Sequence, residues 1–448
     1  MDTELLSGNV SKALLKFSVP VFLSMLIQTL YSTVDMIIIG FYMGKDSISA
    51  VSVGGLIVYV AQVFVSGLIS GTSILIARYV GQNSMKKIRK VVGSSIVFLI
   101  IVTVGMTVLM LVSCRSLAQI MNTPNESFEQ TIIYVSICVA GLCFNVAFNL
   151  AAAIFRGVGD SKSPFWFAIY SCIFNIVGDL LLVAGLHMGV AGAALATIAA
   201  QAFGAFISFF SLSKKKYIKD FSRKDIGLKQ NSDTIYQIIK LGLPLGLQDA
   251  LIQLSFVLVQ RLVNGMGIDY SASYGVGIKI LGYILLVPTS FMITLSTFVS
   301  QNAGARKSER TKQGLAAGIK ISVMIGVAAY VLVFLQGDVL SRFFVSDQKV
   351  VSLSAQFLKG IAVDGITLSF LYCLCGYFNG YGKSRFVMIQ GILGAFLIRV
   401  PLAYLFRGHH SIFLIGLATP ISSFIQMASC LVYYRYLTGK KLIDRDII

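Results

Sequence analysis

Charged side chains are scarce in this sequence. Asp, Glu, Lys and Arg make up 12% of the 448 residues, whereas hydrophobic residues make up 56%. A water-soluble domain of this length needs far more charge to cover its surface. The scarcity of charge excludes a soluble protein and indicates that lipid is the main solvent of the chain.

Acidic residues are the scarcer of the two charged classes. The 19 Asp and Glu residues face 37 Lys and Arg residues, which gives a net charge of +18. The basic residues are scattered over short segments between apolar runs, so we predict no nucleic-acid partner. Basic loops that face anionic lipid account for the charge.

Catalytic and metal-binding motifs are also missing. His187, His409 and His410 lack metal-type spacing, and most of the seven cysteines lie in apolar runs, as packing thiols do. The Gly-Lys-Ser turn at 382–384 lacks the first glycine of a phosphate-binding loop, because Tyr377 stands there. We therefore predict no enzyme and no cofactor.

Long apolar runs, each separated by a short polar segment, predict twelve transmembrane helices. Backbone groups in lipid must be satisfied within their own segment, which favours helices over strands. The predicted spans are 17–43, 51–77, 91–113, 131–155, 164–186, 190–212, 236–264, 273–300, 314–336, 352–379, 386–406 and 411–437. The first run is too long for the apolar core of a signal peptide.

The loops differ in charge. Most of the 37 Lys and Arg residues fall in the loops that share a side with the N-terminus, and the alternate loops hold few. Under the positive-inside rule both termini are cytoplasmic. We therefore expect a multi-pass protein of the plasma (inner) membrane, active as a monomer.

The two halves of the chain resemble each other. LLKFSVPVFLSMLIQ (14–28) echoes IIKLGLPLGLQDALIQ (238–253), RYVGQN (78–83) echoes TFVSQNAG (297–304), and FRGVGDSKSPF (155–165) echoes FNGYGKSRF (378–386). Six spans in each half give both copies the same orientation and a cavity between them. We predict an all-α membrane protein with two pseudo-symmetric six-helix lobes around a central cavity: an N-lobe at 1–212, a cytoplasmic linker at 213–235 and a C-lobe at 236–448.

These motifs also indicate a family. The duplicated FSVP-type opening, the acidic residue late in the first helix, VGQN after the second span and RGVGDSKSP between the fourth and fifth resemble the multidrug and toxic compound extrusion (MATE) family. The resemblance covers essentially the whole chain, and GLPLGLQDALIQLSFVLVQ in the seventh span is similar to prokaryotic members.

Asp35 is the first candidate for a functional residue. It lies within the first span, where an ionised carboxylate costs at least about 2.5–3.5 kcal/mol. Its counterpart in the second half is Gln260, so the fold does not need the charge. Asn175 and Asp179 share one face of the fifth span, and Thr197 and Asn149 offer further oxygens.

The set of Asp35, Asn175, Asp179 and Thr197 is similar to the N-lobe ion site of the family. Such oxygens suit Na⁺, and two close carboxylates could instead bind a proton, so the coupling ion stays open. The alternative is a set of structural hydrogen bonds between helices. Tyr31 and Gln28 lie on the same face as Asp35 and, with Gln260, are candidates to line a substrate cavity.

Two acidic residues stand in the second half, Asp249 in the seventh span and Asp364 in the tenth. Some relatives use acids in these helices for cation coupling, but the seventh-span glutamate typical of them has no match here. A salt bridge with Lys279, Lys320, Lys359, Arg261 or Arg399 is the alternative.

The resemblance implies a secondary antiporter that exports small organic cations or drugs in exchange for H⁺ or Na⁺. One alternative is a lipid-linked oligosaccharide flippase of the same superfamily, which usually has more spans and a more basic cavity. A membrane-embedded enzyme is the other, and the missing catalytic motifs disfavour it.

Overall fold

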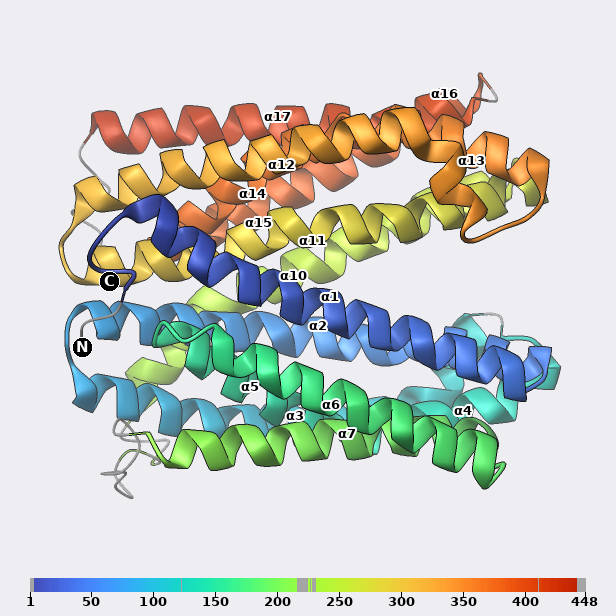
Figure 1. Ribbon diagram of the computed structural model, residues 1–448, viewed down its shortest axis with the longest axis horizontal. Helices are drawn as coiled ribbons and strands as arrows, with labels where there is room; N and C mark the ends of the chain where they lie inside the picture. The colour runs from blue at the N-terminus through green and yellow to red at the C-terminus, as the bar shows by residue number, and fades with distance from the viewer. Residues whose placement is uncertain are drawn as a thin grey trace. The chain divides into compact units, whose positions relative to one another are not determined.

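The computed structural model describes residues 4–121, 123–215, 225, 227, 231–409 and 411–440. In this part of the chain the regular secondary structure is helical (Figure 1). The first half contains α1 (Val10–Tyr42), α2 (Lys45–Gly81), α3 (Met85–Ile120), α4 (Asn125–Ala140), α5 (Leu142–Gly157), α6 (Lys162–Asp179), the π-helix η1 (Leu180–Gly185) and α7 (Gly189–Ser213). The second half contains α10 (Ser232–Asn264), α11 (Ile268–Gly304), α12 (Ser308–Arg342), α13 (Gln348–Ile361), α14 (Asp364–Gly380), α15 (Ser384–Leu393), the π-helix η3 (Gly394–Arg399), α16 (Val400–Arg407) and α17 (Ile412–Gly439).

The helices are long and apolar enough to cross a bilayer. Ten of the spans found in the described residues qualify by themselves. The pairs α4–α5 and α13–α14 qualify only together, as spans bent by 46° and 45°, which brings the count to at most twelve. The prediction of an all-α membrane protein is confirmed, and the twelve predicted spans equal the upper end of this count.

The chain forms two compact units. Unit 1 contains the residues up to Phe22 and those from Leu247 onward, and unit 2 contains Leu23–Gly246. The chain therefore passes from one unit to the other inside α1 and again inside α10, in each case two residues after a proline, Pro20 or Pro244. The units divide the chain at other points than the predicted ranges 1–212 and 236–448, and most of the predicted linker at 213–235 lies outside the described residues.

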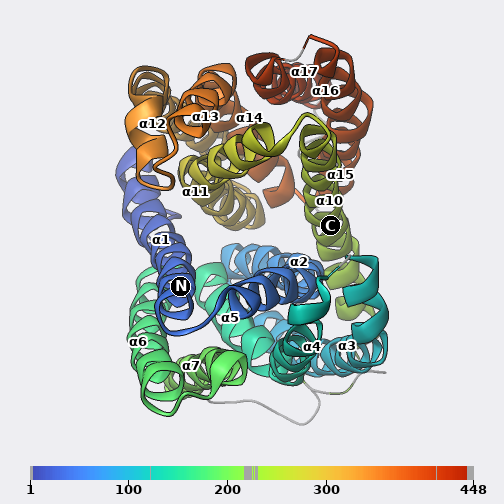
Figure 2. The same ribbon diagram turned by 90° about the vertical axis from the view of Figure 1, so that its right-hand side faces the viewer.

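Unit 2 is built around α2, which packs against α3, α4 and α5. Helix α7 contacts α4, α5 and α6 (Figure 2). The start of α10 belongs to the same core, where Ile238 and Leu241 are buried.

Glycines make the close contact between α2 and the start of α10. A Cβ atom added to Gly67 would lie 2.1 Å from the backbone nitrogen of Gly246, and one added to Gly71 would lie 2.7 Å from that of Gly242. These distances are too short for any side chain. Two small-x-x-x-small faces thus let the two backbones touch, as in membrane helix pairs.

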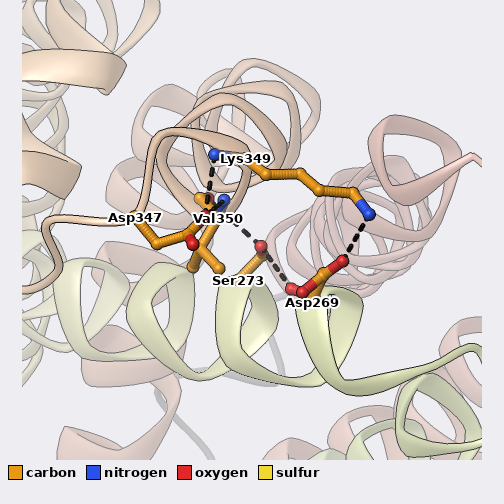
Figure 3. A network of polar contacts seen from close by, with 5 residues as sticks. All are labelled: Asp269, Ser273, Asp347, Lys349 and Val350. Atoms are coloured by element: carbon orange, nitrogen blue, oxygen red, sulfur yellow. Dashed lines mark hydrogen bonds and ion pairs between the residues drawn. The ribbon is translucent and has the colours of Figure 1, made fainter.

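Unit 1 has α11 at its centre, packed against α12, α13 and α14. The start of α1 is packed into this unit with Leu14, Phe17 and Val21 buried. At one end of the unit, polar contacts join α11 to α13 (Figure 3). Asp347 caps α13 by accepting from the backbone N–H of Val350, and Lys349 forms an ion pair of 2.5 Å with Asp269.

Candidate functional site

A polar pocket lies among four helices of unit 2, α1, α5, α6 and α7. The space open to the centres of water molecules in it is about 40 Å³. That is room for an ion with one or two waters, and it is far below the volume of a drug-sized site. Its polar lining consists of Gln28, Tyr31, Asn145, Asn149, Ser171, Asn175, Thr197 and Gln201, and we call this set, with Asp35 and Asp179, the ion pocket.

Helical spacing explains how the ion pocket forms. On each of the four helices its polar residues are three or four positions apart, so they share one face of that helix. Asp35 lies one turn beyond Tyr31 on α1, and Asp179 lies one turn beyond Asn175 on α6. Asn149, Asn175 and Thr197, which the sequence predicts for the ion site, line this pocket. Gln28 and Tyr31, predicted to line a substrate cavity, line the same pocket.

The carboxyl groups of Asp35 and Asp179 lie close enough to interact through a side-chain hydrogen bond. No hydrogen bond of standard geometry, however, reaches Asp35 Oδ1 or either carboxyl oxygen of Asp179 from the described part of the chain. A proton shared between the two carboxyl groups would allow this contact, because two ionised carboxylates at this distance would repel each other. A bound cation would relieve the same repulsion.

Asn175 adds to this unsatisfied polarity. Both Asn175 and Asp179 are 1% exposed, and neither the amide nitrogen nor the amide oxygen of Asn175 has a partner among the described residues. A buried polar group without a partner costs about 1–3 kcal/mol. An ion with its waters would supply the missing partners, and oxygen ligands of this kind suit Na⁺.

The backbone changes its winding next to these residues. Helix α6 continues beyond Asp179 as the π-helix η1, so Asp179 lies at the junction of the two. Such π-segments are rare and occur frequently at functional sites, because the wider turn re-aims the neighbouring side chains.

Other contacts hold the lining in place. Tyr31 of α1 lies beside the side chain of Gln201 on α7. Asn149 Nδ2 donates to the backbone oxygen of Asn145 over 2.9 Å and to its Oδ1 over 3.2 Å. Asn145, Ser171 and Gln201 were not predicted from the sequence, although each lies one turn from a residue that was.

Asp364 and its neighbours belong to unit 1 and are arranged differently. Asp364 is fully buried on α14, and the hydroxyl of Ser423 and the guanidinium of Arg399 lie near it. Neither of its carboxyl oxygens has a hydrogen-bond partner among the described residues. Arg399 in turn donates to the backbone oxygen of Ile252 over 3.2 Å and to the hydroxyl of Ser255. Of the five cations predicted as salt-bridge partners for the second-half acids, Arg399 is the one that lies near Asp364.

The remaining predicted residues lie elsewhere in unit 1. Asp249 is exposed on α10 and lies near Tyr372. Gln260 donates to the Oδ1 of Asn264 over 2.7 Å. Neither Asp249 nor Asp364 forms an ion pair with Lys or Arg in the residues that the structure covers, and the same holds for the two carboxyl groups of the ion pocket. The ion pocket differs in bringing two carboxyl groups together, whereas Asp364 has the guanidinium of Arg399 nearby.

These features define a multi-span α-helical membrane protein that encloses a buried, ion-sized polar pocket. Comparison with known families shows that the chain belongs to the MatE family, whose model matches residues 20–181 and again residues 244–405. The two matches begin at Pro20 and Pro244, the prolines of the repeated first helix. The family consists of transporters, so the resemblance to it and the prediction of a non-enzyme are both confirmed.

Curated relatives are similar over nearly the whole chain. The probable multidrug resistance protein YoeA of Bacillus subtilis is 24% identical over 446 residues, which cover 98% of this chain and 96% of YoeA. The multidrug export protein MepA of Staphylococcus aureus (strain N315) is 24% identical over 393 residues, 87% of this chain and 86% of MepA.

Solved structures share the fold. A crystal structure of MATE in the straight conformation has a TM-score of 0.91 at 23% identity and covers 98% of both chains. A transporter of the MOP superfamily from Pyrococcus furiosus, described as having a binding pocket of reversed polarity, has a TM-score of 0.90 at 23% identity and 97% coverage of both.

Proposed function

We propose that this protein is a secondary active antiporter of the bacterial cell membrane that exports drug-like organic cations in exchange for H⁺ or Na⁺. The names of YoeA and MepA, a multidrug resistance protein and a multidrug export protein, support the substrate class. The ion pocket supports the coupling of export to the entry of H⁺ or Na⁺. The observation that carries the proposal is the contact between the half-buried Asp35 and the buried Asp179, two acids on different helices without a cationic partner among the described residues.

The size of the ion pocket separates the two ligands. About 40 Å³ admits the coupling ion but no organic cation, so substrate and ion bind in different places. Exchange of ion for substrate then requires that the bound ion favours either the outward-open or the inward-open conformation of the protein. A ligand shifts such an equilibrium only by binding the two states unequally. The ion would bind at Asp35, Asn175, Asp179 and Thr197. Asn149 of α5 contributes a further side-chain oxygen to this ion site.

Alternation of access follows from this difference in binding. An ion that enters from outside would favour the conformation that has released its substrate, and loss of the ion to the cytoplasm would favour reloading. Both termini are cytoplasmic in this scheme, as the distribution of Lys and Arg predicts.

The decisive variant is Asp35→Asn, which keeps the shape of the side chain and removes its charge. We expect uptake of a fluorescent cation into inverted proteoliposomes to lose its dependence on an imposed ion gradient. Na⁺ and pH gradients are imposed separately, so the ion whose gradient drives uptake by the unmodified protein is the coupling ion.

Asp338→Asn is the matched control, because Asp338 is an exposed carboxylate on α12 of unit 1. It should transport like the unmodified protein. Gradient-driven transport by the Asp35→Asn variant at an undiminished rate would overturn the assignment of the ion pocket. If the unmodified protein moved lipid-linked sugar and no organic cation, the flippase alternative would hold instead.

A further inference from the structure

An open groove lies along one face of α17 in unit 1, beside the start of α15. Its volume is about 570 Å³, and its walls include Phe386 of α15 and Phe424, Ala428, Val432, Tyr433 and Tyr436 of α17. Phe424 and Val432 are 59% and 70% exposed. The rings of Phe386 and Tyr433 are stacked with their centroids 3.8 Å apart, so the groove has a packed aromatic wall.

The groove ends in positive charge. Phe424, Ala428, Val432 and Tyr436 follow one another at intervals of four residues, and Lys440 continues this series just beyond the end of α17. Lys440 Nζ lies 4.8 Å from the ring centroid of Tyr436. Arg435 lies seven residues after Ala428 and therefore on the same side of the helix.

A third basic side chain, Arg385, is exposed at the start of α15 next to Phe386. Within the described ranges none of Arg385, Arg435 and Lys440 forms an ion pair with an acidic side chain. All three lie in loops or helix ends that the charge distribution predicts to face the cytoplasm. Anionic lipids are concentrated in the membrane leaflet on that side.

We propose that this groove is a binding site for an anionic phospholipid of the bilayer. The acyl chain lies along the series from Phe424 to Tyr436, and the phosphate lies at Arg435 and Lys440. An apolar wall alone would take any lipid or a helix of another protein. The free cations at its end select a ligand that has both a long apolar chain and a negative headgroup, since each basic side chain near the headgroups adds to the attraction.

Binding of defined lipids to the purified protein tests this proposal. We expect the intact protein to retain phosphatidylglycerol, seen as bound lipid by native mass spectrometry, about tenfold more strongly than phosphatidylcholine with the same acyl chains. The double variant Arg435→Gln/Lys440→Gln should lose this preference, and increasing salt should weaken it in the unmodified protein.

The matched control is Lys86→Gln/Lys87→Gln, which removes two exposed positive charges from the start of α3 in unit 2. It should keep the full preference for phosphatidylglycerol. A third variant, Ala428→Trp, fills the groove from an exposed position and should reduce retention of both lipids while leaving the protein folded, as judged by its thermal unfolding.

Three results would overturn the proposal. The first is equal retention of both lipids by the unmodified protein, and the second is an equal loss of preference in the Lys86/Lys87 control, which would indicate unspecific attraction by net charge. The third is unchanged lipid retention together with a changed oligomeric state in Ala428→Trp, which would identify the groove as a protein interface.

Discussion

Thr197 offers the most selective test of the ion pocket at the scale of a single residue. Thr197 lines the pocket from α7 together with Gln201. Thr197→Val keeps the shape of the side chain but removes the oxygen, and a hydrogen bond or ligand contact to a charged group is worth about 1.5–3 kcal/mol. We therefore expect the concentration of coupling ion at half-maximal transport to rise about tenfold or more.

Thr197→Ser serves as the control, because serine keeps the hydroxyl and loses only a methyl group. Its ion dependence should stay within about threefold of the unmodified protein. If the valine and serine variants shifted the ion dependence equally, packing of the methyl group would matter and the hydroxyl would not be a ligand.

Residues of the ion pocket were predictable where a polar side chain interrupts an apolar span. Asp35, Asn175 and Asp179 stand out because each costs free energy in lipid unless it has a function or a partner. Asn145, Ser171 and Gln201 are less visible, since hydroxyl and amide side chains occur in many membrane helices as contacts between neighbours. Which neighbouring helices face each other decides their role, and no single helix carries that information.

At the scale of helices, the glycine contact between α2 and α10 gives a prediction about stability. Gly67→Val would place side-chain carbons on the backbone of Gly246, where a Cβ atom alone already comes within 2.1 Å. The two helices would have to separate, and we expect a loss of about 3 kcal/mol or more in the free energy of unfolding. Thermal unfolding of the purified protein measures it.

Gly55 provides the control, because it lies on the same helix and a Cβ atom added there meets nothing within 4 Å. Gly55→Ala should be neutral or stabilise the helix by up to about 1 kcal/mol. An unfolding temperature of Gly67→Val equal to that of Gly55→Ala would show that the two backbones are not in contact in the membrane.

The apolar centres of the helices were predictable, because each span must bury about 20 apolar residues in lipid. The predicted span 314–336 is helix α12 at Ser308–Arg342, and 190–212 is α7 at Gly189–Ser213. The helices are longer than the apolar runs, since polar residues at their ends reach into water. The bends between α4 and α5 and between α13 and α14 were not predicted, because no proline marks either of them.

At the scale of the whole molecule, the division of α1 and α10 between the two units was not predictable from hydropathy. An apolar run reports that a segment is in lipid, but it does not report which helices lie beside it. Buried Leu14 and Phe17 place the start of α1 in unit 1, whereas Asp35 on the same helix belongs to unit 2. The ion pocket is thus connected through one continuous helix to residues that pack in the other unit.

Side chains of unit 1 hold the segment that precedes α1. Arg310 at the start of α12 donates to the backbone oxygens of Leu5, Ser7 and Gly8 over 3.2, 2.7 and 2.8 Å. Lys307 donates to that of Leu6 over 2.9 Å. Leu5 itself is 2% exposed, so this short segment is fixed to unit 1 by both packing and hydrogen bonds.

Arg310→Gln removes the charged fork that reaches three of these carbonyl groups. We expect amide hydrogen exchange in residues 5–14 to become about tenfold faster, because the hydrogen bonds to Arg310 oppose local opening of the segment. Exchange in unit 2 should not change. Arg306→Gln, an exposed arginine in the same α11–α12 loop, is the matched control and should leave the exchange of residues 5–14 as it is.

The same pair of variants connects the segment to transport. If the start of α1 must stay fixed to unit 1 while ion binding acts on its other end, Arg310→Gln should lower the transport rate and leave the half-maximal ion concentration unchanged, because the ion pocket itself is intact. The start of α1 would then anchor the helix, and its other end would bind the ion. An altered ion affinity at a normal transport rate would contradict this assignment. Unchanged exchange and transport in Arg310→Gln would show that packing of Leu5, Leu14 and Phe17 alone holds the segment.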